Sequence, residues 1–248
     1  SSTPGWQYDH FDVIQDGIDV VAENGSVYVY NGTYYESVLV DKTIELIGEN
    51  REKTIIDAQY SGSPIRLTSN NVNVSHFSVI NCKDVNNQYA GIDVDSNNNY
   101  IYDCEAYNNT EKGILVWDDY YNTIDSCYFH DNDEQGIALG WDNHYTTVIN
   151  CTVDNDWIKA AKPSSNIQII NCTVKNAGIT IEDTTNCRIY NCKINNSPSH
   201  GISICHYTGS GHDNIIENNI ISSSNNNGIW FESNDYNIIK NNTIKNSG

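Results

Sequence analysis

The feature that most constrains this chain is an internal repeat with a fixed marker residue. The marker is a cysteine that recurs every 20 to 24 residues, at Cys82, Cys104, Cys127, Cys151, Cys172 and Cys192. Asn219 and Asn242 continue the phase. An aliphatic residue always stands three positions before the marker, and an apolar residue stands two positions after it except at Asp84. Such a period is typical of a solenoid, in which each repeat forms one coil.

A second motif, Gly-Ile-x-apolar, follows within most repeats. Its copies are Gly91–Val94, Gly113–Val116, Gly136–Leu139, Gly178–Ile181, Gly201–Ile204 and Gly228–Phe231. Alternating apolar residues over four or five positions indicate short strands with one buried face. Three such strands per repeat predict an all-β, right-handed parallel β-helix with coils of about 20–24 residues. The Asn before most markers should form a turn ladder, because Asn tolerates the left-handed backbone of a sharp corner.

The first sixty residues lack this repeat. The segment Phe11–Glu23 carries apolar residues at roughly helical spacing, which predicts a short helix capping the open first coil. Strands are expected at Ser26–Tyr30, Ser37–Gly48 and Thr54–Asp57. We therefore expect a cap and first coil in residues 1–60 and one continuous set of coils in residues 61–248. Because the chain stops at Gly248 in mid-coil, a following domain or self-association through this open end is expected.

The charge balance limits the partners. Asp and Glu total 32 against 13 Lys and Arg, giving a net charge of −19. Nucleic acid and anionic membranes need clustered basic residues, so both are excluded as partners. A polyanionic substrate is disfavoured unless cations bridge it to the protein. No run of about 18 apolar residues is present, so no membrane span is expected. The start at Ser1 and the absence of Met fit a mature secreted or trimmed chain, and favour an extracellular or cell-surface location.

The N-terminal segments resemble a known superfamily. These segments are Phe11–Val21, Val27–Glu36, Ile44–Asn50 and Thr54–Asp57. They are similar to the N-terminal part of pectin-lyase-like β-helices, and the chain most resembles the NosD-like repeat domains (carbohydrate-binding and sugar-hydrolase β-helices) of archaeal and bacterial surface proteins. The resemblance covers essentially the whole chain and implies an extracellular location and contact with polysaccharide. The catalytic motifs of pectin methylesterases, alginate epimerases and polygalacturonases have no counterpart here, so the resemblance implies no specific activity.

One outer face of the predicted coil gathers acidic and aromatic residues. In the Gly-Ile strand the two apolar residues point inward, so the residues between and after them line this face. Aromatic rings stack on sugars and carboxylates bind hydroxyl groups, which makes the face the predicted ligand surface. Its candidate ligand-binding residues are Asp93, Asp95, Trp117, Trp141, Lys162, Glu182, Asp183, His206, Tyr207, Trp230 and Glu232. The alternative is a solvated acidic face whose aromatics pack on adjacent loops.

Catalytic candidates lie on the same face. A glycosidase needs two carboxylates about 5 to 9 Å apart, and coil steps of about 4.8 Å would allow this for Asp118 with Asp142 or with Asp95. A lyase or epimerase needs a base. Lys159 and Lys162 are the only basic residues expected on this face, and Lys159 is the candidate base. The alternative is that the divergent repeat around these lysines only carries a variant turn.

Calcium is the one cofactor that the acidic face suggests, because hard cations prefer several oxygen ligands. The candidate ligands are Asp95, Asp118, Asp119 and Asp142, although the Asp-rich loop of an EF-hand is absent.

The marker cysteines are expected in the core, where Cys behaves as a small hydrophobe. Disulfides between adjacent coils and a metal site are the alternatives, but a column of inward thiols does not converge as zinc ligands do. Cys187 and Cys205 fall outside the phase and are expected either to pair or to be free thiols.

Three classes of function are consistent with these features. The preferred one is a secreted or cell-surface module that binds polysaccharide or serves as a scaffold. The second is a polysaccharide-processing enzyme, which could be a glycoside hydrolase, a lyase or an epimerase. The third is a structural element that self-assembles end to end.

Overall fold

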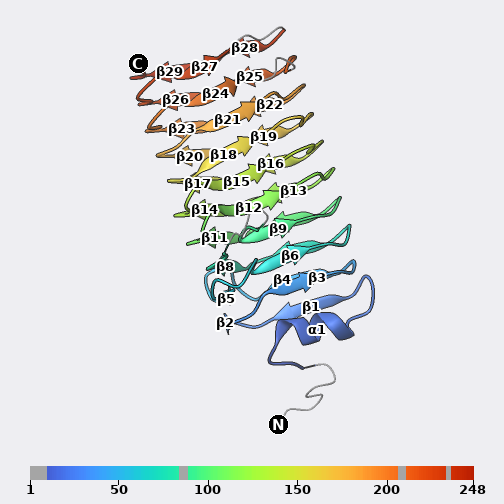
Figure 1. Cartoon of the computed structure of the whole chain (residues 1–248). Coiled ribbons are helices and arrows are strands. Elements are labelled where there is room, and N and C mark those ends of the chain that lie inside the picture. Colours follow the sequence, from blue (N-terminus) through green and yellow to red (C-terminus); the bar gives the residue numbers. More distant parts are fainter. Residues whose placement is uncertain (1–9, 84–88, 206–210, 233–235) are drawn as a thin grey trace.

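The structure is a computed structural model that describes residues 10–83, 89–205, 211–232 and 236–248. Within these residues the chain winds into a right-handed parallel β-helix with three sheets, which confirms the predicted fold class. Successive strands of one sheet come from successive coils and lie above one another along the axis (Figure 1). Every pairing between them is parallel, as the stacked repeat requires.

The strands of the described residues form two sheets of ten and one of nine. Sheet I holds β1 (Ser26–Val29), β4 (Glu45–Gly48), β7 (Asn73–Ser75), β10 (Tyr100–Tyr102), β13 (Thr123–Asp125), β16 (Thr147–Ile149), β19 (Gln168–Ile170), β22 (Arg188–Tyr190), β25 (Ile215–Glu217) and β28 (Ile238–Lys240). Sheet II holds β2 (Gly32–Tyr34), β5 (Thr54–Asp57), β8 (Ser78–Ile80), β11 (Glu105–Tyr107), β14 (Tyr128–His130), β17 (Thr152–Asp154), β20 (Thr173–Lys175), β23 (Lys193–Asn195), β26 (Ile220–Ser222) and β29 (Thr243–Lys245). Sheet III holds β3 (Val38–Val40), β6 (Ile65–Leu67), β9 (Ile92–Val94), β12 (Lys112–Val116), β15 (Gln135–Leu139), β18 (Trp157–Ala160), β21 (Ile179–Glu182), β24 (Ile202–Cys205) and β27 (Ile229–Phe231).

The core is a set of columns of aliphatic side chains. In sheet I the middle residue of each three-residue strand points inward, so Ile101, Ile124 and Val148 lie in register and are fully buried. One continuous hydrophobic cluster runs from Ile14 to Ile221. Since each coil contacts only its neighbours, this continuous core is the main source of stability along the axis.

From Asn71 onward, one residue at each corner of the coil adopts the left-handed backbone conformation, with φ between 46° and 65°. The corner between sheets III and I uses Asn71, Asn98, Tyr121, Tyr145, Asn166, Asn186, Asp213 and Tyr236. The corner between sheets I and II uses His76, Asp103, Ser126, Asn150, Asn171, Asn191, Asn218 and Asn241. The corner between sheets II and III uses Asn81, Asn108, Asp131, Asn155, Asn176, Asn196, Ser223 and Asn246. Asn is frequent at these positions because its short polar side chain lowers the cost of this conformation.

The predicted asparagine ladder is present at the corner between sheets I and II. The side-chain amide of Asn191 donates to Asn171 Oδ1 at 2.8 Å. Asn171 in turn donates from Nδ2 to Asn150 Oδ1 at 3.4 Å, and Asn150 donates to Asp125 Oδ1 at 3.1 Å. The prediction is therefore confirmed, and the same conformation recurs at two further corners that the repeat analysis did not single out.

From Asn71 onward, the corner residues divide each coil into two sides of constant length and one of variable length. In these coils the corners that flank sheet I, and those that flank sheet II, are five residues apart, as in Asn166, Asn171 and Asn176. The sheet III side needs ten residues from Asn176 to Asn186 but seventeen from Asn196 to Asp213. From Asn71 onward, all differences in coil length therefore fall on the side of the prism that carries sheet III. The second coil also has a longer turn between β4 and β5, five residues longer than the turn between β7 and β8.

All six marker cysteines are buried, and five of them lie in one column. A column of five buried, free thiols is formed by Cys104, Cys127, Cys151, Cys172 and Cys192. Burial raises the pKa of the Cys104 and Cys127 thiols well above its usual value, so they stay protonated and pack as small hydrophobes, as predicted. Cys187 and Cys205 are also buried free thiols.

Cys82 does not belong to this column, so that part of the predicted phase is wrong. The strand before Cys82 is β8 of sheet II, whereas the strand before Cys104 is β10 of sheet I. Cys82 therefore lies one corner further along its coil, where its backbone N–H donates to Asn109 Oδ1 at 2.9 Å. Two sides of the prism use the same five-residue pattern, and the repeat alone does not tell them apart.

The N-terminal cap is a single short helix, α1 (Ile14–Val20), which packs on β1 and β3. It confirms the predicted helix but is shorter than the segment Phe11–Glu23. The long strand expected at Ser37–Gly48 is in fact two strands, β3 and β4, separated by a bend at Lys42 and Thr43. The short strand β2 was not predicted. The first coil thus already has the three sides of the later ones.

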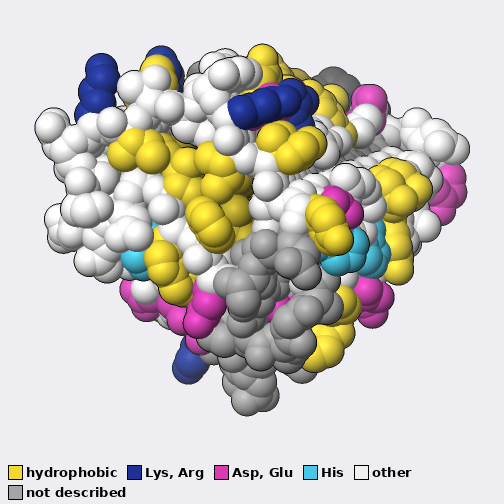
Figure 2. Space-filling model, turned by 90° about the horizontal axis from the view of Figure 1, so that it is seen from above, with side chains coloured by type: hydrophobic (Ala, Val, Ile, Leu, Met, Phe, Trp, Pro, Cys, Tyr) yellow, Lys and Arg dark blue, Asp and Glu magenta, His cyan; other side chains and the backbone are white. Residues whose placement is uncertain are grey.

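The opposite end of the solenoid leaves apolar side chains uncovered. Phe231, Ile238, Ile239 and Ile244 are all exposed there, and hydrophobic side chains gather on this end when it is viewed from above (Figure 2). Self-association or a following domain at this end stays a prediction. In the part of the chain that the structure describes, no helix is long and apolar enough to cross a membrane.

Candidate functional site

The outer face of sheet III carries the residues predicted to form the site. Each sheet III strand has one outward residue between its two inward residues, and the strand register confirms that these outward residues form a row. Arg66 pairs with Asp93, Asp93 with Leu115, and Leu115 with Ala138. The row then continues through Lys159, Thr180, Ser203 and Trp230.

The first part of this row is covered, which differs from the sequence expectation of an open face. Asp93 is only 1% exposed, and Leu115 and Ala138 are buried with Ala90 in a small second apolar cluster. Ala90 stands two residues before β9 and packs with these two side chains. The carboxylate of Asp93 is not open to a ligand in solution, whereas Lys159 and Thr180 remain accessible.

Arg66 is a basic residue of this face that the sequence analysis missed. Its guanidinium contacts Asp93 Oδ2 at 3.2 Å and also binds Asp95 Oδ2. The expectation that Lys159 and Lys162 are the only basic residues here is therefore wrong. Arg66 sits in an Ile65-x-Leu67 strand that has the right apolar spacing but lacks the leading glycine of the other copies. The spacing alone could have found it.

A polar hollow of about 390 Å³ lies further along the same face. It is lined by Asp133, Glu134, Gln135, Trp157, Lys159, Thr180 and Glu182. Lys159 Nζ forms an ion pair with Glu182 Oε1 at 3.0 Å. The hollow thus places one aromatic ring beside hydrogen-bond donors and acceptors of both charges.

Sequence analysis had singled out Lys159 and Glu182 but not their neighbours in the hollow. Trp157 is in register with Gln135, which in turn is in register with Lys112. Each of these residues begins its strand. Lys112 and Gln135 precede the Gly of the Gly-Ile motif and Trp157 replaces it, so the motif does not assign them to this face. Extending each strand by one or two residues toward its start would have revealed them.

The end of sheet III carries two exposed tryptophans on adjacent coils. Trp117 and Trp141 are 43% and 55% exposed. A Cβ atom at Gly140 would lie 2.6 Å from Cε3 of Trp117, so the indole lies directly over this glycine. The lack of a side chain at Gly140 therefore leaves room for the Trp117 ring, which any larger residue would displace.

The two proposed glycosidase carboxylates are brought together. Asp118 and Asp142 occupy the same corner position on adjacent coils, both with left-handed backbone, and the Asp118 N–H donates to the Trp141 carbonyl at 2.8 Å. Asp142 Oδ1 also contacts His144 Nε2 at 2.9 Å. Asp142, burial and Asp118 together raise the pKa of the Tyr120 phenol. Tyr120 thus lies within the electrostatic reach of both carboxylates.

Asp119 differs from its two acidic neighbours because it is buried. It is 5% exposed, and burial, followed by the charges of Asp95 and Asp118, raises the pKa of its carboxyl to about 7. Two of the other proposed calcium ligands already have partners in the protein: Arg66 binds Asp95, and His144 contacts Asp142. Among the described residues, no group of three His, Cys, Asp or Glu side chains is arranged to hold a metal ion. Calcium binding stays a prediction.

The remaining candidate residues lie toward the C-terminal coils. Lys162 Nζ is 3.7 Å from the buried Asp183 Oδ2. The Trp230 ring stacks on His200 with centroids 4.9 Å apart, and Glu232 is exposed. His206 and Tyr207 lie outside the described residues.

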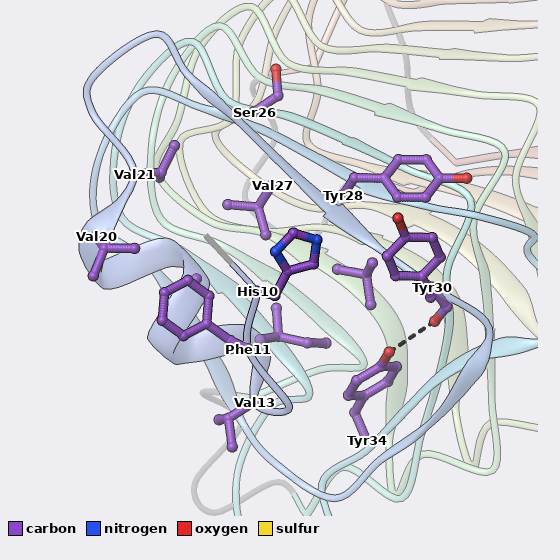
Figure 3. Close-up of a pocket in the computed structure, with 13 residues that line it drawn as sticks. His10, Phe11, Val13, Val20, Val21, Ser26, Val27, Tyr28, Tyr30 and Tyr34 are labelled. Carbon is purple, nitrogen blue, oxygen red and sulfur yellow. Dashed lines mark hydrogen bonds between the residues drawn. The ribbon is translucent and has the colours of Figure 1, made fainter. Parts of the chain in front are cut away.

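A second hollow of about 460 Å³ lies at the capped end, away from sheet III (Figure 3). It opens between α1 and β1, and Phe11, Val27 and Tyr30 are among the side chains around it. The Tyr34 hydroxyl, which also borders it, donates to the Tyr30 carbonyl at 2.9 Å. Its lining is mostly apolar and contains no carboxylate, so it shares none of the charged groups of the sheet III face.

Comparison with known proteins supports the fold. Residues 65–209 and 177–248 match the family described as the right handed beta helix region. No curated protein sequence matches the chain. Pectin methylesterase from carrot is similar in structure, with 14% identity, a TM-score of 0.60, and coverage of 100% of this chain and 86% of that chain. A mannuronan C-5 epimerase A-module from Azotobacter vinelandii shares 16% identity at a TM-score of 0.53, covering 94% of this chain and 91% of that one. The catalytic domain of a GH87 α-1,3-glucanase in complex with nigerose shares 13% identity at a TM-score of 0.51, covering 99% and 67%.

These solved structures include an esterase, an epimerase and a glucanase. At identities this low the likeness extends to the fold alone, because one fold supports many activities. The family match, by contrast, covers most of the coils. The chain belongs to the right-handed β-helix family and has the pectin-lyase-like form of that fold.

Proposed function

We propose that the outer face of sheet III binds polysaccharide, and that the protein acts as a secreted or cell-surface module. The observation that carries this proposal is that, from Asn71 to Asn246, all variation in coil length falls on the sheet III side. In solenoids, insertions collect on the face that contacts a ligand, because the other sides must keep their length to preserve stacking.

The side chains of this face suit a sugar polymer. Trp117, Trp141 and Trp157 offer rings that can stack on the apolar faces of sugars. Lys159, Glu182 and Gln135 offer donors and acceptors for hydroxyl groups in the adjoining hollow. The coils between Trp117 and Glu182 present only small residues, Gly140 and Ala161, in the intervening positions of the same row. A chain of sugars could therefore cross three coils, roughly 14 Å at about 4.8 Å per coil.

The test is retention by polysaccharides in affinity electrophoresis, with a double variant Trp117→Ala, Trp141→Ala. The variant should lose about tenfold in affinity, since stacking on an aromatic ring contributes about 0.5–1.5 kcal/mol per ring. Tyr102→Ala is the matched control, because this exposed ring lies on sheet I. Equal retention of the wild type and the tryptophan variant would contradict the proposed site.

A polysaccharide-processing enzyme is the second candidate, and the pairing of Asp118 with Asp142 on adjacent coils favours it. A retaining glycosidase holds its carboxyl groups about 5 Å apart, close to one coil step of about 4.8 Å. Release of reducing ends from a polysaccharide, abolished by Asp118→Asn or Asp142→Asn while folding is preserved, would establish the enzyme. Binding without any product would leave the binding module as the function.

A further inference from the structure

We propose that the ligand of the sheet III face is a neutral glycan, one that carries no carboxylate or sulfate groups. This inference rests on the proposed function and adds the chemical class of the ligand. It follows from the state of the basic side chains on this face and from the acidic groups around them.

Four basic side chains on the sheet III side are each engaged by a carboxylate of the protein itself. Arg66 binds Asp95, and Lys159 lies 3.0 Å from Glu182. The two other pairs are Lys112 with Glu111 at 2.7 Å and Lys162 with Asp183 at 3.7 Å. An anionic sugar would have to displace one of these carboxylates, because a uronate is normally held by a cation that is free to pair with it.

No further Lys or Arg comes from the segments that the structure does not describe. Residues 1–9, 84–88, 206–210 and 233–235 contain no Lys or Arg. Lys83 is an exposed residue before β9, outside the row of the hollow. The pairs described above therefore account for the Lys and Arg side chains of the site.

Acidic groups outnumber basic ones around the hollow. Asp133 and Glu134 line it, and in the described residues neither forms an ion pair with Lys or Arg. With the Lys159–Glu182 pair neutral overall, the hollow keeps two negative charges. Asp118 and Asp142 extend the negative charge toward the tryptophans. A carboxylate on the ligand would be repelled at these distances, whereas sugar hydroxyls can both donate to and accept from the groups present.

The experiment compares binding of neutral and uronic polysaccharides by the whole chain. The neutral set is a β-glucan, an α-glucan and a galactomannan, and the acidic set is polygalacturonate and alginate. Affinity is measured by electrophoresis in gels at low and high salt, with chelator and with calcium. The wild type should bind at least one neutral polymer, and bind it at least about tenfold more tightly than either uronate at low salt, with the difference shrinking as salt screens the repulsion.

Glu182→Gln sharpens the test because it releases Lys159 from its partner. This variant should gain at least several-fold in affinity for polygalacturonate. Glu217→Gln is the matched control, since it removes the same charge on sheet I, where Glu217 contacts Arg188 and Lys240. If Glu182→Gln fails to fold by circular dichroism, the exposed pair Asp133→Asn, Glu134→Gln serves instead and should also improve uronate binding.

The outcomes separate the two proposals. Preferential binding of a uronate by the wild type, with or without calcium, would overturn the neutral-ligand inference and leave polysaccharide binding in place. Failure of the charge variants to improve uronate binding would also overturn it, because the ion pairs would then not exclude anions. Absence of binding to every polymer would refute the proposed function itself.

Discussion

The two ends of the solenoid share one core but differ greatly in charge. Residues 1–156 contain 26 Asp and Glu but only six Lys and Arg. Residues 157–248 contain six Asp and Glu and seven Lys and Arg. The net charge of −19 therefore comes entirely from the first part. The inward columns continue across the boundary without a break, with Val153, Val174 and Ile194 in register. Outward charge can thus vary along the axis while the fold is maintained by the inward and corner residues.

The corners differ between the same two regions. In residues 157–248 most corner residues are Asn, as at Asn166, Asn171 and Asn176. In the acidic region His76, Asp103, Tyr121, Ser126 and others take this role. The corner geometry is the same in both, so the later coils have the more regular sequence and the earlier coils the more varied one. A varied region with exposed aromatic residues is where we place the tryptophan part of the site.

Truncating one core column in both regions gives the largest expected effect. Phe129→Ala should lower the free energy of unfolding by about 3–5 kcal/mol and Ile194→Ala by about 2–5 kcal/mol, because both side chains are fully buried in the same column. Urea unfolding at low and high salt measures both. A loss below about 1 kcal/mol at Ile194 would break the view that the two regions share one core.

Asp156 lies at the boundary between the two regions and carries a buried carboxyl group whose charged form destabilises the folded protein. It continues the buried column of Asn109 and Asn132, and accepts from Asn132 Nδ2 at 2.7 Å. Burial is the main cause that raises its pKa to about 6, from 3.8. The folded state therefore binds the proton more tightly than the unfolded state, and stability falls as pH rises from about 4 to above 6.

Asp156→Asn should remove this loss and gain about 1–3 kcal/mol at pH 8, with little gain at pH 4. The new amide could donate to the Phe129 carbonyl, which is in register with the Ala106 carbonyl that accepts from Asn132. Asp154→Asn, on the strand before it, is the control and should be nearly neutral. Denaturation followed at several pH values provides the measurement, and a gain independent of pH would contradict the assigned titration.

Corner substitutions should have intermediate effects. Asn171→Ala should cost about 1–2 kcal/mol, because Ala adopts the left-handed conformation poorly and the amide bonds to Asn191 and Asn150 are lost. Asn171→Gly should cost less, since glycine reaches this conformation without a steric penalty. Thermal unfolding of both variants gives the comparison. Equal losses would mean that the ladder bonds, and not the backbone, set the cost.

Surface charge should have the smallest effect on stability. The double variant Asp133→Asn, Glu134→Gln removes two exposed acids from the acidic region and should change the free energy of unfolding by less than about 0.5 kcal/mol. It should slightly flatten the dependence of stability on salt. A loss above about 1 kcal/mol would show that these acids support the fold, contrary to the separation of charge and core described above.

Most of the fold could be predicted from the sequence because its determinants are local and periodic. Alternating apolar residues gave the strands, and the Asn before each marker gave one corner. The phase of Cys82 could not be found in this way. The pattern Val79-Ile80-Asn81-Cys82 in sheet II is indistinguishable from Ile101-Tyr102-Asp103-Cys104 in sheet I. Only the pairing of strands assigns such a pattern to a side of the prism.

The site was less predictable because it depends on contacts between coils. The row of outward residues followed from spacing, but the small apolar cluster of Ala90, Leu115 and Ala138 joins residues of three adjacent coils. The pairing of Arg66 with Asp95 joins residues 29 positions apart. The approach of Trp117 to Gly140 likewise joins residues of two adjacent coils. None of these contacts leaves a local trace in the sequence.

The constant length of two sides has a consequence for how such a protein can change over generations. An insertion within a five-residue side, such as that between Asn166 and Asn171, would disturb the stacking of that coil on its two neighbours. An insertion between Asn176 and Asn186 only enlarges a loop on the sheet III side. Lineages that carry this architecture can therefore acquire a new ligand one loop at a time, while the sequence that specifies folding stays under unchanged selection.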